Sequence, residues 1–281
     1  MPQGRLRGAD EKRSQLVNKL TAETSKGGVS AAVLKYTAVA LMILNHLTTT
    51  LFDFVFEVPD LVDLLFVLVT RASFILFAFL TAEGLAHTSS RTKYFLRMVI
   101  FAAASEPFFD LCFQGGFFDF SYQNVFFTHA LAIAGVAVEE RMREKTKLSK
   151  LVLLLPMAAA LLLRCDYSLF GVGVIYIFYY SRTGSRRTLF LMLTAACLAL
   201  LPVYRVLNEL IFGSGELGFR FWLSAFASGL LESAGLVIIP LIDAYNGSRG
   251  KQINKYVWYA VYPAHLLLLG ALRWAVTQGA G

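Results

Sequence analysis

The sequence predicts an all-α integral membrane protein that crosses the bilayer about nine times, with its N-terminus in the cytoplasm and its C-terminus outside. Its 281 residues are 57% hydrophobic and only 16% charged, and their mean hydropathy is +0.59. Soluble domains are closer to about 25% charged. Two further observations support the prediction, namely a series of apolar segments of membrane-helix length and an alternation of Lys and Arg between the loops.

Nine apolar segments are the candidate spans, because a helix needs roughly 20 mostly apolar residues to cross the hydrocarbon core. They cover about 31–52, 61–86, 94–113, 123–140, 148–164, 166–181, 188–212, 220–242 and 255–277. The short segments 148–164 and 166–181 form either two short helices that meet at the outer surface or one re-entrant element. Residues 1–28 are polar and lack the apolar region of a signal peptide, so we expect a cytoplasmic tail followed by a single transmembrane domain, 29–281.

The distribution of Lys and Arg sets the predicted orientation. Twenty of the 26 Lys and Arg residues lie in the N-terminal tail and in every second loop after it, two lie in the other loops, and four lie within spans. Cytoplasmic loops of membrane proteins carry such an excess of positive charge. Topology therefore explains the net charge of +7, and we expect no nucleic-acid partner.

Several ionisable or polar side chains fall within the predicted spans, where an ionised group costs at least ~2.5–3.5 kcal/mol and usually faces a partner or a polar cavity. Lys35 lies near the cytoplasmic start of the first span, and His46 lies roughly 16 Å further along the same helix. The others lie near the middle of a span (Arg71, Glu106, Glu232 and His265) or in its outer half or rim (Asp110, Asn124, His129, Arg164 and Asp166). Together with the basic group Arg91, Lys93 and Arg97, they indicate a polar path whose cytoplasmic mouth is basic.

Each of these residues also has a purely structural interpretation. Lys35 can extend its amine to the interface, and an intramembrane His is often a hydrogen-bond partner between helices. Glu106 precedes Pro107, so it can satisfy backbone groups that a proline kink leaves free. The number of costly groups at depth nevertheless favours a functional cavity.

The three cysteines give no sign of a metal site. Cys112, Cys165 and Cys197 are dispersed through apolar segments without a CxxC or Cys/His pattern. Free cysteines behave as small buried hydrophobes. We therefore expect them to pack in the interior, and we expect no metal.

The most specific block of the sequence is RASFILFAFLTAEGLAHTSSRTKYFLRMVIFAAASEPFFDL at 71–111, which resembles the TraX family of membrane proteins. That family is associated with N-acetylation of the pilin subunit in conjugative bacteria. The segment LKYTAVALMILNH at 34–46 stands where the family has its first-helix motif, which usually ends in Asp-His instead of Asn-His. Three further blocks follow in the family's order, NVFFTHAL at 124–131, DYSLFGVGVIYIFYY at 166–180 and YVWYAVYPAHLLLL at 256–269. The resemblance covers most of 34–269, although 188–250 matches only in hydropathy.

The TraX family in turn resembles the transmembrane acyltransferases, whose first helix carries an Arg-x10-His motif with the catalytic histidine. Lys35 and His46 have that spacing, with Lys in place of Arg, so the bidentate fork of a guanidinium is lost. The resemblance implies that Lys35 helps to hold the cytosolic end of an acyl-CoA and that His46 acts deeper. It also implies a multi-pass protein of the bacterial inner (plasma) membrane, with acetyl-CoA as acyl donor.

The main hypothesis is transfer of an acetyl group from cytosolic acetyl-CoA to an amine or hydroxyl acceptor at or beyond the membrane. His46 is the expected base, Arg71 the expected stabiliser of the oxyanion, and Glu106 is expected to orient His46 or the acceptor amine. The candidates for binding acetyl-CoA are Lys35, Arg91, Lys93 and Arg97, and those for the acceptor side are Asp110, Asn124 and His129. The acceptor could be a peptide N-terminus, a sugar or a secreted amphiphile, and membrane lipid is the other expected partner.

Two alternatives come from other classes of protein. A proton-coupled transporter would also use intramembrane His, Glu and Arg, although the sequence shows no internal repeat. A non-catalytic membrane scaffold would have little reason to keep so many costly charges. The sequence leaves the acceptor, the length of the acyl chain and the oligomeric state open.

Overall fold

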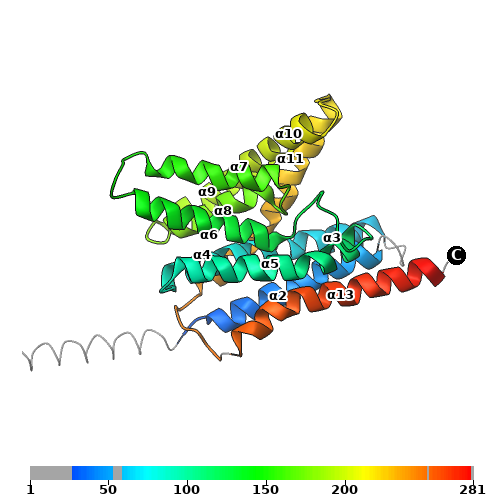
Figure 1. The fold of residues 1–281 in the computed structure, drawn as a ribbon, viewed down its shortest axis with the longest axis horizontal. Helices are drawn as coiled ribbons and strands as arrows, with labels where there is room; N and C mark the ends of the chain where they lie inside the picture. Colours follow the sequence, from blue (N-terminus) through cyan, green and yellow to red (C-terminus); the bar gives the residue numbers. More distant parts are fainter. Residues whose placement is uncertain (1–26, 53–58, 252, 280–281) are drawn as a thin grey trace, which may run out of the picture.

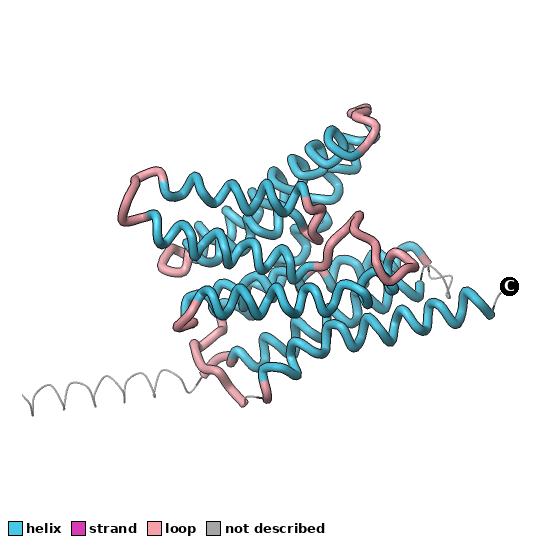
Figure 2. Tube along the Cα trace, in the orientation of Figure 1, coloured by secondary structure: helices cyan, strands magenta, loops and turns pink. Residues whose placement is uncertain are grey.

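The described part of the chain, residues 27–52, 59–251 and 253–279 of the computed structural model, folds into a bundle of helices (Figures 1 and 2). Most of the predicted tail, 1–26, lies outside the described residues. Within the described ranges there is no β-strand. The elements are α2 (Ala31–Leu47), η1 (Thr48–Phe52), α3 (Asp60–Thr70), α4 (Ala72–His87), α5 (Arg91–Phe113), α6 (Val125–Met142), η2 (Ser149–Leu153), α7 (Leu154–Leu162), α8 (Ser168–Tyr180), α9 (Arg186–Ala195), η3 (Ala196–Leu200), α10 (Leu201–Phe212), α11 (Phe219–Ser233), η4 (Ala234–Ile238), α12 (Ile239–Asp243) and α13 (Lys255–Gly279).

Several of these elements continue directly into one another, so the described chain contains nine helical segments. α3 leads into α4, η2 into α7, α9 through η3 into α10, and α11 through η4 into α12. Each segment overlaps one of the nine apolar segments of the sequence, which confirms the all-helical prediction, and α7 and α8 are separate helices. Four segments are long and apolar enough to cross a membrane, namely Ala31–Thr50, Asp60–His87, Arg186–Phe212 and Phe219–Asp243, whereas Ser149–Leu162 and Ser168–Tyr180 are apolar but shorter.

The centre of the bundle is formed by α8, whose side chains are buried on nearly every side of the helix. Phe170, Val172 and Ile175 are fully buried, where α8 packs against α4, α6 and α7. A helix that is apolar all round is typical of such an interior position or of a membrane span. A second, smaller apolar cluster around Phe109 and Tyr262 joins α13 to α5 and α2.

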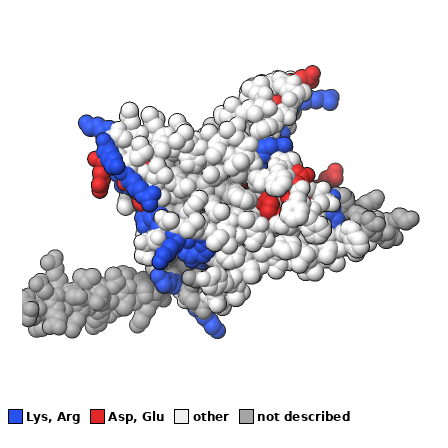
Figure 3. Space-filling view, in the orientation of Figure 1, with Lys and Arg blue, Asp and Glu red and all other residues white. Residues whose placement is uncertain are grey.

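The surface is apolar along the bundle and basic at one end. Figure 3 shows most Lys and Arg side chains gathered at the left end of the view, which we call the basic end. Its exposed members are Lys93, Arg141, Arg143, Lys145, Lys147, Lys150, Arg182, Arg186, Arg187, Arg249 and Lys251. The flanks carry exposed apolar side chains such as Leu155 and Leu230, at 68% and 67% exposure. An exposed apolar surface this extensive marks a contact with a membrane or with another protein.

Candidate functional site

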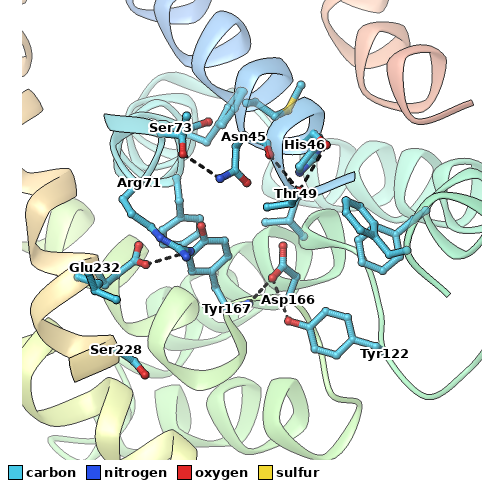
Figure 4. A pocket seen from close by; sticks show the side chains of 18 of the residues that line it. Asn45, His46, Thr49, Arg71, Ser73, Tyr122, Asp166, Tyr167, Ser228 and Glu232 are labelled. Atoms are coloured by element: carbon cyan, nitrogen blue, oxygen red, sulfur yellow. Dashed lines mark hydrogen bonds and ion pairs between the residues drawn. The ribbon is translucent and has the colours of Figure 1, made fainter. Parts of the chain in front are cut away.

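A cavity of about 600 Å³ lies between α2, α4, α10, α11 and the turn that precedes α8 (Figure 4). Its lining includes the ends of α2 and α5 and the turn that leads into α8, so it occupies the half of the bundle away from the basic end. Its polar lining consists mainly of Asn45, His46, Arg71, Tyr122, Asp166, Tyr167, Arg205 and Glu232, and its apolar lining is largely aromatic. In the described ranges, no group of three or more His, Cys, Asp or Glu side chains is placed to hold a metal ion.

His46 lies in the last turn of α2, where the helix widens into the π-helical η1. The hydroxyls of Thr48 and Thr50 donate hydrogen bonds to the carbonyl groups of Asn45 (2.8 Å) and His46 (2.5 Å). Bonds of this kind, from a Thr hydroxyl to a carbonyl group one turn earlier, often accompany a distortion of the helix. On its other side, the Nδ1 atom of His46 lies 2.7 Å from the Nε2 atom of His265 on α13. The imidazole of His46 is therefore held in place at the cavity wall.

The neighbouring Asn45 ties α2 to α3. Its side-chain amide donates to the hydroxyl of Thr70 at 2.9 Å, and that hydroxyl donates to the carbonyl group of Phe66 at 2.8 Å. Because these bonds fix Asn45 toward α3, it supports the helix that carries His46 without contacting the imidazole by a hydrogen bond.

Arg71 lies at the junction of α3 and α4, opposite Glu232 on α11. Its Nη1 atom is 3.5 Å from Oε2 of Glu232, which is only 3% exposed. The backbone of η4 packs closely against that of Arg71 at Gly235, because a Cβ atom at this position would lie 2.8 Å from the carbonyl oxygen of Arg71. The Nε atom of Arg71 and the Oε1 atom of Glu232 are buried without a hydrogen-bond partner among the described residues. Buried polar atoms are nearly always paired, so this donor and this acceptor indicate a place for a polar ligand or water.

The turn between α7 and α8 brings Asp166 and Tyr167 to the cavity. Its backbone is left-handed at Arg164 (φ 51°), Tyr167 (φ 57°) and Ser168 (φ 44°), which costs about 1–3 kcal/mol for each such residue. Two hydrogen bonds with Gln123 hold the turn, one from the N–H of Gln123 to the carbonyl of Arg164 (3.1 Å) and one from the N–H of Asp166 to the carbonyl of Gln123 (2.8 Å). Strain of this kind persists only where the surroundings fix it, and it is frequent at functional sites.

The Asp166 carboxylate is fixed in direction by two donors. Its Oδ1 atom accepts hydrogen bonds from the hydroxyl of Tyr122 and from the backbone N–H of Tyr167, both at 3.0 Å. The ring of Tyr167 stacks on Phe74 with the ring centroids 3.8 Å apart, and it lies beside Arg71 (Figure 4). The cavity thus has one wall rich in charge, made by the start of α4, the turn between α7 and α8, and α11, and a second wall that carries His46.

Two of the three predicted catalytic residues, His46 and Arg71, meet at this cavity, but Glu106 lies elsewhere. The Oε2 atom of Glu106 accepts hydrogen bonds from the backbone N–H of Asn124 (3.2 Å) and from its side-chain amide. Asn124 is the N-cap of α6. Glu106 therefore supports the start of α6, and the residue that hydrogen-bonds the His46 ring is His265.

The predicted acceptor-side residues also have partners away from the cavity. Asp110 accepts the N–H of Asp119 at 2.8 Å and so closes the loop between α5 and α6. The Nδ1 atom of His129 lies 2.8 Å from the hydroxyl of Thr81 in the interior. Neither of these residues, nor Asn124, lines the cavity.

The predicted donor-binding residues are at or near the basic end, apart from the cavity. Lys35 is half-buried on α2, and Arg97 is half-buried on α5. Arg91 donates to both carboxylate oxygens of Glu140, at 3.0 and 3.1 Å, so its guanidinium already has an anionic partner. Lys93 is exposed.

The family model described as TraX protein matches residues 30–273, a range that runs from the start of α2 into the last turns of α13. The chain belongs to the TraX family. No curated protein and no solved structure matches it. Every residue that lines the cavity of this TraX-family protein falls within the matched range.

Asp166 and Glu232 at the cavity, and His265 behind His46, stand out in the sequence as ionisable residues within apolar segments, but the sequence assigns none of the three a role. Each carries a signal in the sequence, because an isolated ionisable residue in an apolar segment is costly unless it has a partner. The signal does not identify the partner, however, since His46 and His265 are separated by 219 positions in the chain. Only the packing of α13 against α2 and α5 brings the two imidazoles together.

Proposed function

We propose that the chain is a membrane-embedded acyltransferase that transfers an acetyl group from cytosolic acetyl-CoA to an amine or hydroxyl acceptor at or beyond the membrane. The observation that carries the proposal is the meeting of His46 and Arg71 at one polar cavity, between apolar helices of a TraX-family chain. The chain would cross the bacterial inner membrane nine times with its basic end in the cytoplasm, as the excess of Lys and Arg at that end suggests. A peptide N-terminus, a sugar or a secreted amphiphile would serve as acceptor.

The chemistry would begin with His46 as general base. Its imidazole would take the proton from the acceptor amine or hydroxyl as the nucleophile attacks the thioester carbonyl. Arg71 would stabilise the negative charge that develops on the carbonyl oxygen, and its unpaired Nε–H is a suitable donor. The new bond from carbon to nitrogen or oxygen forms, the bond from carbon to sulfur breaks, and CoA leaves as a thiol with the proton returned by His46.

The donor would enter from the basic end. Lys35 and His46 lie on one helix, so an acyl-CoA held near Lys35 would have to extend roughly 16 Å along α2 to bring its thioester to His46. Lys35, Lys93 and Arg97 are the better candidates for the CoA phosphates, because Arg91 is already paired with Glu140. The narrow arm of CoA that ends in the thioester would then reach into the protein, while the charged nucleotide of CoA would stay in the cytoplasm.

The direct test measures transfer or hydrolysis of labelled acetyl-CoA by the purified protein in nanodiscs. We expect His46→Ala to lower turnover by about 10²–10⁴-fold, the usual contribution of general base catalysis. Acetyl-CoA should still raise the unfolding temperature of the variant, because a ligand that binds only the folded state stabilises it. His87→Gln is the matched control, since His87 is an exposed imidazole at the end of α4, away from the cavity.

Two results would contradict the proposal. The first is that the wild-type protein neither transfers an acetyl group from acetyl-CoA nor is stabilised by acetyl-CoA against heat. The second is uptake of a solute into liposomes without any CoA, which would favour the proton-coupled transporter.

A further inference from the structure

The His46 imidazole takes part in a chain of two hydrogen bonds that ends on the backbone. Its Nδ1 atom lies 2.7 Å from Nε2 of His265, and the Nδ1 atom of His265 lies 2.8 Å from the carbonyl oxygen of Val261. The two rings are nearly parallel, with 8° between their planes. His265 is only 9% exposed and does not line the cavity, whereas His46 does.

The carbonyl end of this chain determines where the protons lie. A carbonyl oxygen only accepts, so the Nδ1 atom of His265 must carry the hydrogen. When that ring is neutral, its Nε2 atom has a lone pair and accepts a hydrogen bond. The Nδ1 atom of His46 must then be the donor, and in a neutral imidazole this leaves the lone pair on Nε2. None of the described residues hydrogen-bonds the Nε2 atom of His46.

We infer that His265 is a positioning residue that, anchored by the carbonyl of Val261, holds His46 in the tautomer whose Nε2 lone pair is available to the cavity. A base on Nε2 is what the proposed proton transfer requires, so the catalytic part of the inference rests on the proposed function. The arrangement of protons does not, because it follows from the two hydrogen bonds alone. The role also gives α13 a part in the site although it contributes no charge to the cavity.

The tautomer can be measured directly by nitrogen NMR of the protein labelled at histidine in nanodiscs. The chain has only four histidines, so single substitutions assign each ring. We expect His46 to be protonated at Nδ1 in the wild-type protein. His265→Gln should keep that state, because the end of a Gln side chain can place an acceptor near the position of Nε2. His265→Asn should lose it, because the shorter Asn reaches only toward Val261.

Turnover should follow the tautomer. We expect His265→Asn to lower kcat by roughly 10²-fold, with little change in KM for acetyl-CoA, and His265→Gln to restore most of kcat. His87→Asn is the control for labelling and folding, and it should leave the His46 signals unchanged.

Several results would overturn the inference. One is a wild-type His46 protonated at Nε2, which decides the matter even if the His265 variants fail to fold. Another is a His46 tautomer that His265→Asn leaves unchanged. A wild-type protein that shows the expected tautomer but does not use acetyl-CoA would instead overturn the proposed function and leave the hydrogen-bond chain intact.

Discussion

Arg71 and Glu232 form an ion pair in the cavity wall, with Nη1 and Oε2 3.5 Å apart and the carboxylate side chain almost wholly buried. Removing one partner of such a pair leaves the other charge without compensation, at a cost of about 3–5 kcal/mol for fully buried pairs. Because the Arg71 side chain is 33% exposed, solvent screens part of this cost, and we expect the lower end of that range for Glu232→Leu. Thermal unfolding in nanodiscs measures the loss.

The same measurement on Arg71→Met and on the double variant completes a double-mutant cycle. We expect the double variant to be more stable than the two single losses predict when added, because neither charge is then left alone. The pair formed by Arg186 and Asp243 at 3.2 Å, with both side chains more than one-third exposed, is a suitable control and should couple by less than about 1 kcal/mol. Purely additive losses for Arg71 and Glu232 would show that the two charges do not stabilise one another.

Gly235 sets the distance between η4 and the helix junction at Arg71. A methyl group there would meet the Arg71 carbonyl oxygen at 2.8 Å, and a backbone atom cannot move aside as a flexible side chain can. We expect Gly235→Ala to destabilise the protein by about 1–3 kcal/mol, the usual cost of overpacking, and to lower turnover by shifting Glu232. Gly116→Ala is the control, since no atom lies within 4 Å of the added methyl group. Equal unfolding temperatures for the two variants would contradict this account.

The helices of this fold could be predicted from the sequence because a long apolar segment is a feature of local composition. Each of the nine apolar segments corresponds to a helical segment, and the boundaries agree within a few residues. The widened turn η1 after His46 and the left-handed turn at 164–168 could not be predicted. Both depend on hydrogen bonds with side chains or with a loop that lies elsewhere in the chain.

The site was predictable only in part, for a related reason. The free-energy cost of an ionisable group in an apolar segment identifies His46 and Arg71 as candidates. It also identifies Glu106 and His129, whose polar groups instead form hydrogen bonds with Asn124 and Thr81. A buried polar group has to be paired whether it is catalytic or structural, so the sequence gives both classes the same signal. The distinction depends on which partners are near in space.

Asn124 illustrates a structural role that can be tested separately from catalysis. Its side-chain oxygen caps α6, while its side-chain NH2 group donates to Glu106 and, at 2.9 Å, to the backbone carbonyl of Ala102. Asp is as good an N-cap as Asn, so capping alone predicts that Asn124→Asp is neutral. We expect instead a loss of about 1–3 kcal/mol, because the amide donors disappear and a second carboxylate faces Glu106.

A cap on the surface provides the comparison. Ser185 caps α9 by accepting the N–H of Thr188 at 3.1 Å, and it is exposed. We expect Ser185→Asp to change the unfolding temperature little, since Asp keeps the cap and its charge suits the start of a helix. If both substitutions are neutral, the hydrogen bonds from Asn124 to Glu106 and Ala102 contribute little to stability.

The nine-span topology predicts which side of the membrane each loop faces. Cys112, Cys165 and Cys197 are buried and free, so they provide an unreactive background for single reporter cysteines. Ser121, in the loop between α5 and α6, and Lys147, between α6 and η2, are both exposed at opposite ends of α6. Because Lys and Arg mark the cytoplasmic side, we expect Ser121→Cys to react with a membrane-impermeant maleimide in intact cells and Lys147→Cys to react only after the membrane is opened. The reverse pattern would invert the predicted orientation, place the basic end outside and remove the proposed entry route for acetyl-CoA. Labelling of both positions in intact cells would place both ends of α6 on one side of the membrane and exclude α6 as a span.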